Sequence, residues 1–177
     1  MSERGVAPPP AAVRRERSGD AGAIREVNRL AFATPAEARL VDALRARGKL
    51  VVSLVAERES RVVGHIAFSR AVAAARPDVP GVGLGPMAVV PALRSRGVGS
   101  ELVRAGLAEC AALGFSFAVV LGHPEYYPRF GFLAASGFGL SCRWPVPEGV
   151  FMALELTPGA LAGAGGAVAY EPEFDDV

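Results

Sequence analysis

The sequence Arg94-Ser95-Arg96-Gly97-Val98-Gly99-Ser100 joins two segments with different patterns of apolar residues. The run before it, Met87–Val90, is short, apolar and partly β-branched, which is typical of a buried strand. The segment after it, Val98–Leu113, repeats its apolar residues with the spacing of a helix. The chain therefore predicts a strand, a glycine-rich turn and a helix in that order.

The composition of this turn favours an anion. The first N–H groups of a helix have no partner within the helix and carry partial positive charge, which suits a phosphate or pyrophosphate. Gly97 and Gly99 have no side chain that would keep a ligand from the backbone, and Arg94 and Arg96 add guanidinium groups that match phosphate oxygens. We therefore expect a phosphorylated ligand at the turn.

Two common nucleotide motifs do not fit this turn. A Walker loop needs Gly-Lys followed by Ser or Thr, and the only lysine of the chain is Lys49. A dinucleotide fingerprint needs a third glycine where this chain has Leu102. The turn taken alone leaves open a simpler interpretation, an arginine-rich turn in front of a surface helix.

Composition indicates one globular domain. The 177 residues are 51% hydrophobic and 21% charged, with a formal net charge of +1. Because the basic residues are scattered, nothing favours nucleic acid or a membrane as partner. No apolar run approaches the ~20 residues of a membrane span, so the expected location is the cytoplasm. Cys110 and Cys142 form no metal-binding pattern, and we expect no metal.

Three parts follow from the chain's organisation: a leader over residues 1–12, a domain over 13–158 and a Gly/Ala-rich, then acidic, tail over 159–177. The tail is expected to lie along the surface or to be loose. Within the domain, Thr34, Pro35 and Glu37 have the spacing of a capping box with Pro at the first helical position. They predict a second short helix that ends near Gly48, after a first helix that follows Asp20.

Strands are expected on both sides of the central turn. The runs Leu50–Ala56 and Arg61–Ala71 predict a hairpin, and Phe115–Leu121 continues the central unit as a parallel βαβ crossover. Two further strands are expected at Phe138–Arg143 and Val150–Leu156. The strand before the turn is expected to run from Val82 to Val90 and to contain Pro86, which cannot donate a ladder hydrogen bond, so pairing should fail or bulge beside it.

A second motif lies after Leu121, where Tyr127 precedes Gly131-Phe132 by four residues. Together with Arg-x-x-Gly-x-Gly at 94–99, this motif resembles the GNAT N-acetyltransferases. The strings GLGPMAVVP, LGHPEYYPRFGF and FMALEL are similar to the YhbS-like branch of that family. The resemblance implies an α/β fold with a mostly antiparallel seven-stranded sheet, helices on both faces, and a central parallel pair that parts to hold acetyl-CoA.

The resemblance also implies roles for individual residues. The backbone of Met87, Ala88 and Val89 would pair with the pantetheine amides of acetyl-CoA. The residues that would hold the pyrophosphate are Arg94, Ser95, Arg96, Gly97, Val98, Gly99 and Ser100. Transfer of the acetyl group to a primary amine would pass directly through a tetrahedral intermediate, with Tyr127 contacting the cofactor and donating a proton or hydrogen bond to the leaving thiolate.

No general base stands out in the sequence. His123 follows a strand end near the expected cofactor site and could accept a proton, although such a residue also often caps a turn. Glu37 could reach the acceptor, but a capping box would explain it without catalysis. The sequence identifies neither the acceptor nor the oligomeric state, and a homodimer remains one of the alternatives. The alternative function is a non-catalytic acyl-CoA-binding or regulatory module that retains the turn.

Overall fold

The computed structural model describes residues 10–177, so nine residues of the expected leader lie outside the described part. The strands are β1 (Ala12–Arg15), β2 (Val52–Arg58), β3 (Arg61–Ala73), β4 (Gly81–Val89), β5 (Phe117–Leu121), β6 (Leu133–Ala134), β7 (Leu140–Ser141), β8 (Phe151–Glu155) and β9 (Gly166–Tyr170). The α-helices are α1 (Ala21–Ala31), α2 (Ala36–Ala46) and α3 (Val98–Ala112). The short 3-10 helices are η1 (Ser18–Asp20), η2 (Pro91–Leu93), η3 (Tyr127–Phe130), η4 (Ala135–Phe138) and η5 (Pro172–Asp176).

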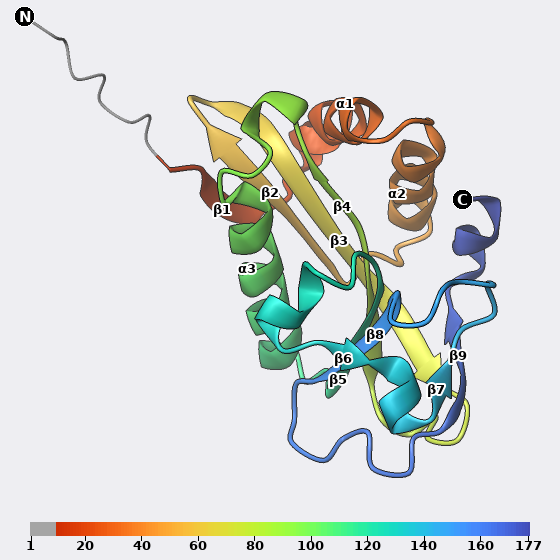
Figure 1. Cartoon of the computed structure of the whole chain (residues 1–177). Coiled ribbons are helices and arrows are strands. Elements are labelled where there is room, and N and C mark those ends of the chain that lie inside the picture. The colour runs from red at the N-terminus through yellow and green to blue at the C-terminus, as the bar shows by residue number, and fades with distance from the viewer. Residues whose placement is uncertain (1–9) are drawn as a thin grey trace, which may run out of the picture.

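The main path of the sheet has the order β1-β2-β3-β4-β5-β8-β6. Neighbours on this path are antiparallel except β4 and β5, which are parallel and joined through α3. This confirms the predicted α/β fold and its central parallel pair. With β7 and β9, which lie off this path, the sheet of the described residues has nine strands rather than the expected seven. Figure 1 shows α3 on one side of the sheet and α1 with α2 on the other.

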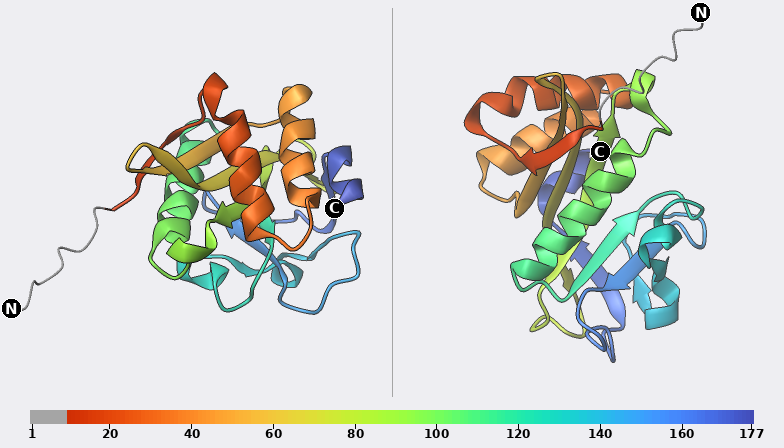
Figure 2. Two further views of the ribbon diagram at one scale, coloured as in Figure 1. Left: turned by 90° about the horizontal axis from the view of Figure 1, so that it is seen from above. Right: turned by 90° about the vertical axis from the view of Figure 1, so that its left-hand side faces the viewer.

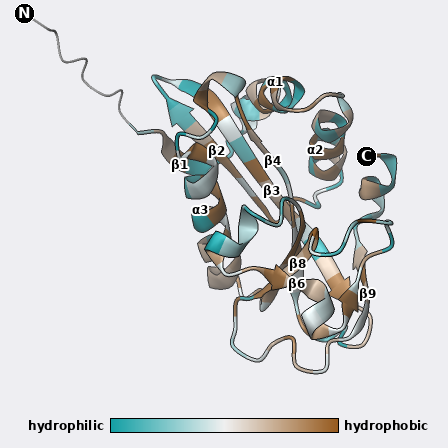
Figure 3. Cartoon of the chain, in the orientation of Figure 1, coloured by the Kyte–Doolittle hydropathy of each residue, from teal (hydrophilic) through white to brown (hydrophobic). Residues whose placement is uncertain are grey.

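Successive strand residues point to opposite sides of the sheet, so apolar side chains lie on both faces and helices cover each of them. In β2, Leu54 and Ala56 belong to the core beneath α3, whereas Val55 packs with Ile24 of α1 and Val41 of α2. The two views in Figure 2 show these helices around the twisted sheet. In Figure 3 the hydrophobic residues concentrate on the strands and on the inner faces of the helices, as burial of apolar surface requires.

The central strands part at Gly85-Pro86. The parallel pairing of β4 with β5 ends at Leu84 opposite Val120, and the register between β3 and β4 shifts between Ile66 and Phe68. The expected failure of pairing beside Pro86 is therefore confirmed. Beyond it, β4 remains paired with β3, but among the described residues it has no strand partner on its β5 side.

The C-terminal segment differs from the expected surface or loose tail. Its strand β9 pairs antiparallel with the far end of β3, with Tyr170 opposite Ala71, and β7 pairs parallel with β9. Val168 and Tyr170 are buried, whereas the alternate residues of β9 are exposed. The Gly/Ala-rich composition concealed this strand because only two of its five side chains carry apolar bulk into the core.

Two local expectations were also wrong. The strand predicted over Phe138–Arg143 shrinks to β7, because the chain before it forms the 3-10 helix η4 and turns at Gly139, whose φ is +71°. The capping box does not form. Helix α2 begins at Ala36 after Pro35, and the hydroxyl of Thr34 accepts a hydrogen bond from the Ala36 N–H at 3.3 Å, which leaves Glu37 outside the cap.

Candidate active site

A groove of about 1490 Å³ opens where β4 and β5 part. Its lining comes from α1, α2, β4, the turn before α3, the segment after β5, the loop after β7 and the C-terminal segment. Pockets for drug-sized ligands usually measure ~300–1,000 Å³. The groove therefore has room for a large ligand and a second, smaller one beside it.

The glycine-rich turn lies at one end of this groove. Gly97 precedes α3 with a φ of +88°, and a Cβ atom at Gly97 would meet open space. Among the described residues no side chain caps the start of α3, so its first N–H groups face the groove without a competing partner. Ser95 also has a positive φ, +59°, which non-glycine residues seldom adopt. The turn is open and shaped for an anion at the helix start.

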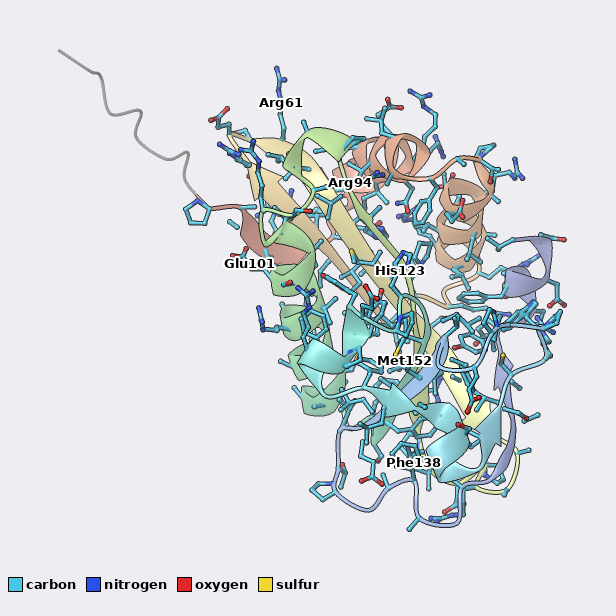
Figure 4. The ribbon with its side chains drawn as sticks, viewed as in Figure 1. Arg61, Arg94, Glu101, His123, Phe138 and Met152 are labelled. Atoms are coloured by element: carbon cyan, nitrogen blue, oxygen red, sulfur yellow. The ribbon has the colours of Figure 1, made fainter. Side chains whose placement is uncertain are left out.

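The groove includes most, but not all, of the residues predicted for the turn. The residues that line it are Arg94, Ser95, Gly97, Gly99 and Ser100. Val98 is buried in the core below the turn, and Arg96 is exposed but does not line the groove. Arg94 donates from Nη2 to the carbonyl oxygen of Ala31 at 2.6 Å, which ties the turn to the end of α1. Figure 4 shows Arg94 near α1 at this end.

The strand β4 contributes its unpaired edge. Met87 and Val89 line the groove, whereas Ala88 is buried with 1% exposure. Side chains alternate along a strand, and consequently Ala88 can reach a groove ligand only through its backbone. These placements fit a ligand that runs along β4 with amide groups to pair.

The segment after β5 brings two tyrosines to the groove. The ring of Tyr127 packs so closely on Gly122 that a Cβ atom there would lie 2.2 Å from the ring. Tyr127 also packs against Phe132 with ring centroids 5.7 Å apart. Burial raises the pKa of the Tyr127 phenol well above its usual value, with a smaller contribution from Tyr126. The phenol is therefore protonated at neutral pH and can donate a hydrogen bond.

Tyr126 contacts the start of α3. Its hydroxyl lies 3.5 Å from the Ser100 Oγ, and a Cβ atom on Gly99 would lie 3.0 Å from that hydroxyl. The guanidinium of Arg129 stacks over the Tyr126 ring at 4.5 Å from its centroid. The Tyr126 hydroxyl therefore reaches the glycine-rich turn.

His123 and Glu37 both line the groove, from different sides. His123 follows β5 and is exposed, as Figure 4 shows near the middle of the molecule. Glu37 extends from the first turn of α2, and its Oε2 is buried with no hydrogen-bond partner among the described residues. The structure thus leaves both a histidine and a carboxylate available to a ligand.

The sequence pattern did not indicate the residues that the C-terminal segment brings to the groove. Tyr170 and Phe174 line it with Trp144, and the Tyr170 ring lies 5.3 Å from the Trp144 ring and 5.2 Å from the Phe174 ring. Tyr170 also packs on Gly83 of β4, beside the point where the strands part. The alternation of Val168 and Tyr170 was the only available signal. Over residues 10–177 no group of three His, Cys, Asp or Glu side chains is arranged to hold a metal ion.

A parallel strand pair that parts beside a helix start, with a groove along the free strand edge, defines the acyl-CoA N-acyltransferase class of fold. Residues 22–132 match the family described as "Acetyltransferase (GNAT) family". The chain belongs to the GNAT acetyltransferase family, and it is an acyltransferase by class. No helix within residues 10–177 is long and apolar enough to cross a membrane.

Similar proteins extend over nearly the whole chain. The Escherichia coli (strain K12) protein named "Uncharacterized N-acetyltransferase YhbS" is 40% identical over 157 residues, covering 88% of this chain and 93% of that protein. The crystal structure of Escherichia coli YhbS in complex with CoA has a TM-score of 0.91 at 37% identity and covers 97% of this chain and 96% of that one. A GNAT family acetyltransferase from Brucella melitensis in complex with acetyl-CoA has a TM-score of 0.78 at 37% identity, covering 93% and 98%.

Proposed function

We propose that this protein is an N-acetyltransferase that moves an acetyl group from acetyl-CoA directly to a primary amine. The observation that carries the proposal is that one groove is lined by the glycine-rich turn, by the free edge of β4 and by Tyr127. The CoA and acetyl-CoA complexes of the similar Escherichia coli and Brucella proteins support the same ligand here.

The donor fits the groove in two parts. The pyrophosphate binds at the start of α3, where backbone N–H groups from Ser95 to Ser100 and the guanidinium of Arg94 offer donors. Arg96 is exposed and does not line the groove, so it adds positive charge near the pyrophosphate but no contact surface. The pantetheine arm lies along the free edge of β4 and pairs with the backbone of residues 87–89.

The reaction balances without a further reagent. The nitrogen of a neutral amine attacks the thioester carbonyl carbon, and a C–N bond forms in a tetrahedral intermediate whose oxyanion accepts a hydrogen bond from a backbone N–H such as that of Val89. The C–S bond then breaks, the nitrogen loses a proton and the thiolate gains one. Fixing the two reactants in one groove supplies most of the acceleration, because such positioning can contribute ~7–11 kcal/mol.

Tyr127 acts on the leaving thiolate, and His123 is the candidate that accepts the amine proton, directly or through water. Because burial raises the pKa of Tyr127, full proton transfer from its phenol to a thiolate is uphill. Its contribution is therefore a hydrogen bond that stabilises the developing charge on sulfur. His123 is exposed at the mouth of the groove, where it can exchange a proton with solvent.

Two measurements on the purified chain test this function. Calorimetric titration compares CoA with ATP and NAD, and a thiol-release assay follows acetyl-CoA turnover over a panel of primary amines. We expect CoA to bind more tightly than either nucleotide and thiol release to require an amine. Tighter binding of ATP or NAD would overturn the assignment, and CoA binding without turnover of any amine would favour the non-catalytic module.

A further inference from the structure

Glu37 has an unused carboxylate oxygen in the groove. Its Oε2 is buried, and no described residue supplies a hydrogen bond to it. The capping role that the sequence offered does not apply, because α2 begins at Ala36 and the Thr34 hydroxyl accepts the Ala36 N–H. A buried carboxylate oxygen without a partner is costly, so the site favours a ligand that brings a donor.

The walls beside Glu37 are apolar or aromatic. Leu40 lies one turn further along the same face of α2 and also lines the groove, as does Phe32 at the C-terminal end of α1. On the far side are Trp144 and Phe174, each of which packs against the Tyr170 ring. Helix α2 packs beside η5, so these walls enclose one end of the groove. Such walls favour an uncharged ligand body.

In the described part of the chain, the cationic side chains near this end of the groove are already paired, Arg47 and Lys49 with Glu173 and Arg143 with Asp175. The two arginines that line the groove are engaged elsewhere, because Arg94 donates to Ala31 and Arg129 stacks on Tyr126 beside α3. The nearby Arg143 does not line the groove; it forms an ion pair with Asp175 and stacks over Trp144. A ligand carboxylate would therefore be buried here without a cation.

We propose that the acceptor is a primary monoamine with an apolar or aromatic body and no carboxylate, and that Glu37 binds its ammonium group, which gives one proton to His123 or to solvent before the neutral nitrogen attacks. The inference rests on the proposed function and narrows it. Glu37 supplies one carboxylate, and the other acidic side chain that lines the groove, Glu125, lies in the exposed segment after β5. A polyamine would therefore bury further charges against the apolar walls. An α-amino acid would place its carboxylate near Glu37, where like charges repel.

A matched set of amines tests the acceptor class by steady-state thiol release. The probes are 2-phenylethylamine, phenylalanine, which adds a carboxylate to the same body, and spermidine, which adds charges. We expect kcat/KM for 2-phenylethylamine to exceed that for each of the others by at least about tenfold, since one unpaired buried charge costs more than 1.4 kcal/mol. A preference for phenylalanine or spermidine would overturn the inference while leaving the transferase activity intact.

The role of Glu37 is tested by Glu37→Gln, which keeps the shape of the side chain and removes its charge. The control is Glu26→Gln on the exposed face of α1, outside this groove. Inhibition constants of 2-phenylethylamine, measured with an alternative amine as the acceptor, and of its uncharged analogue 2-phenylethanol are compared in both variants.

We expect wild type and Glu26→Gln to prefer the charged compound, and Glu37→Gln to lose about tenfold of that preference. CoA affinity should stay at the wild-type value in Glu37→Gln, which shows that the variant is folded and that the donor site is intact. An unchanged charge preference in Glu37→Gln, with CoA still bound, would overturn the inference alone. Failure of the wild-type protein to bind CoA would instead contradict the proposed function.

Discussion

The hydroxyl of Tyr126 lies 3.5 Å from the Oγ of Ser100, so the segment after β5 contacts the first turn of α3. Ser100 follows β4 and Tyr126 follows β5. The contact therefore connects the ends of the two central parallel strands, in addition to the covalent connection through α3. The pair that parts at Gly85 is therefore bridged again at the end of the groove where the pyrophosphate is proposed to bind. Because neither hydroxyl is fully buried, both remain available to a ligand oxygen.

Tyr126→Phe should weaken CoA binding without unfolding the protein. The change removes only a hydroxyl that contacts Ser100, and one hydrogen bond contributes about 0.5–1.5 kcal/mol, which corresponds to a two- to tenfold loss of affinity. Calorimetric titration with CoA measures this loss, and thermal unfolding without ligand serves as the control. An unchanged affinity would show that Tyr126 only packs.

Tyr127→Phe should lower kcat and leave CoA affinity nearly unchanged. The ring contacts with Gly122 and Phe132 remain in the variant, whereas the hydrogen bond to the leaving thiolate is lost. We expect kcat to fall about 100- to 1000-fold, within the range that one positioned donor contributes. Single-turnover thiol release at saturating acetyl-CoA measures the chemical step. A variant with wild-type kcat would exclude Tyr127 from proton or hydrogen-bond donation.

The parts of the site that sequence could predict are those in which a few consecutive residues carry the chemistry. The glycines and guanidinium groups from Arg94 to Ser100 indicate an anion-binding turn, and Pro86 predicts the break in the hydrogen-bond ladder. Both effects depend only on local backbone geometry and are therefore visible in the sequence. The expected parallel pair around α3 follows from the same local order. These predictions needed no knowledge of distant contacts.

The end of the groove that is proposed to bind the acceptor could not be predicted in the same way, because residues far apart in the chain build it. The pairing of Tyr170 with Ala71 joins the last strand to β3, and neither segment indicates the other. At Glu37 a local capping signal competed with the tertiary structure. Helix α2 starts at Ala36, with the Thr34 hydroxyl already bonded there, and the carboxylate faces the groove instead.

Gly97→Ala should weaken CoA binding through the backbone alone. A Cβ atom at Gly97 meets open space, so no steric clash arises, but the φ of +88° is unfavourable for alanine by about 1–2 kcal/mol. If the turn of the unliganded variant relaxes to a more favourable φ, CoA binding has to restore the positive φ. The affinity for CoA then falls by roughly five- to thirtyfold. Calorimetric titration with CoA measures the change.

The matched control is Gly22→Ala on the exposed face of α1, where a Cβ atom also meets open space and φ is not positive. That change should stabilise the protein by about 0.4–1 kcal/mol and leave CoA affinity unaltered. Equal CoA affinities in the two variants and the wild type would show that the conformation of the turn does not govern donor binding.

His65 should make the protein less stable as pH falls from about 6.5 to 4. Its imidazole is fully buried, with Asn28 and Ser53 on its two ring nitrogens at 3.2 and 2.9 Å, and the Ser53 hydroxyl in turn bonds Glu16, which pairs with Arg45. Burial lowers the pKa of His65 from 6.5 to about 4, with opposing smaller effects from Glu16 and Arg45.

The sign follows from proton binding. Between the two pKa values the unfolded chain binds a proton that the folded protein does not, so stability falls with acidification by up to about 1.4 kcal/mol per pH unit. His65→Gln retains a donor for Ser53 and removes the titrating ring. Urea unfolding at about pH 7 and pH 5 should show a smaller loss of stability in the variant than in the wild type. An equal loss in both proteins would mean that other groups cause the acid sensitivity.

Glu173→Gln should loosen the C-terminal segment and weaken acceptor binding, with the donor site unaffected. The Glu173 side chain is 2% exposed and accepts hydrogen bonds from Arg47 at 2.7 Å and Lys49 at 3.0 Å, which fastens η5 to the end of α2. Hydrogen bonds to charged groups contribute about 1.5–3 kcal/mol, so the free energy of unfolding should fall by about 2 kcal/mol.

Phe174 lies next to Glu173 and lines the groove, and consequently KM for the amine should rise while CoA affinity stays constant. The control is Asp78→Asn, whose pair with Arg76 is exposed and whose loss should leave stability nearly unchanged. If Glu173→Gln lowered stability but left KM for the amine unchanged, the C-terminal segment would support the fold without shaping the acceptor site.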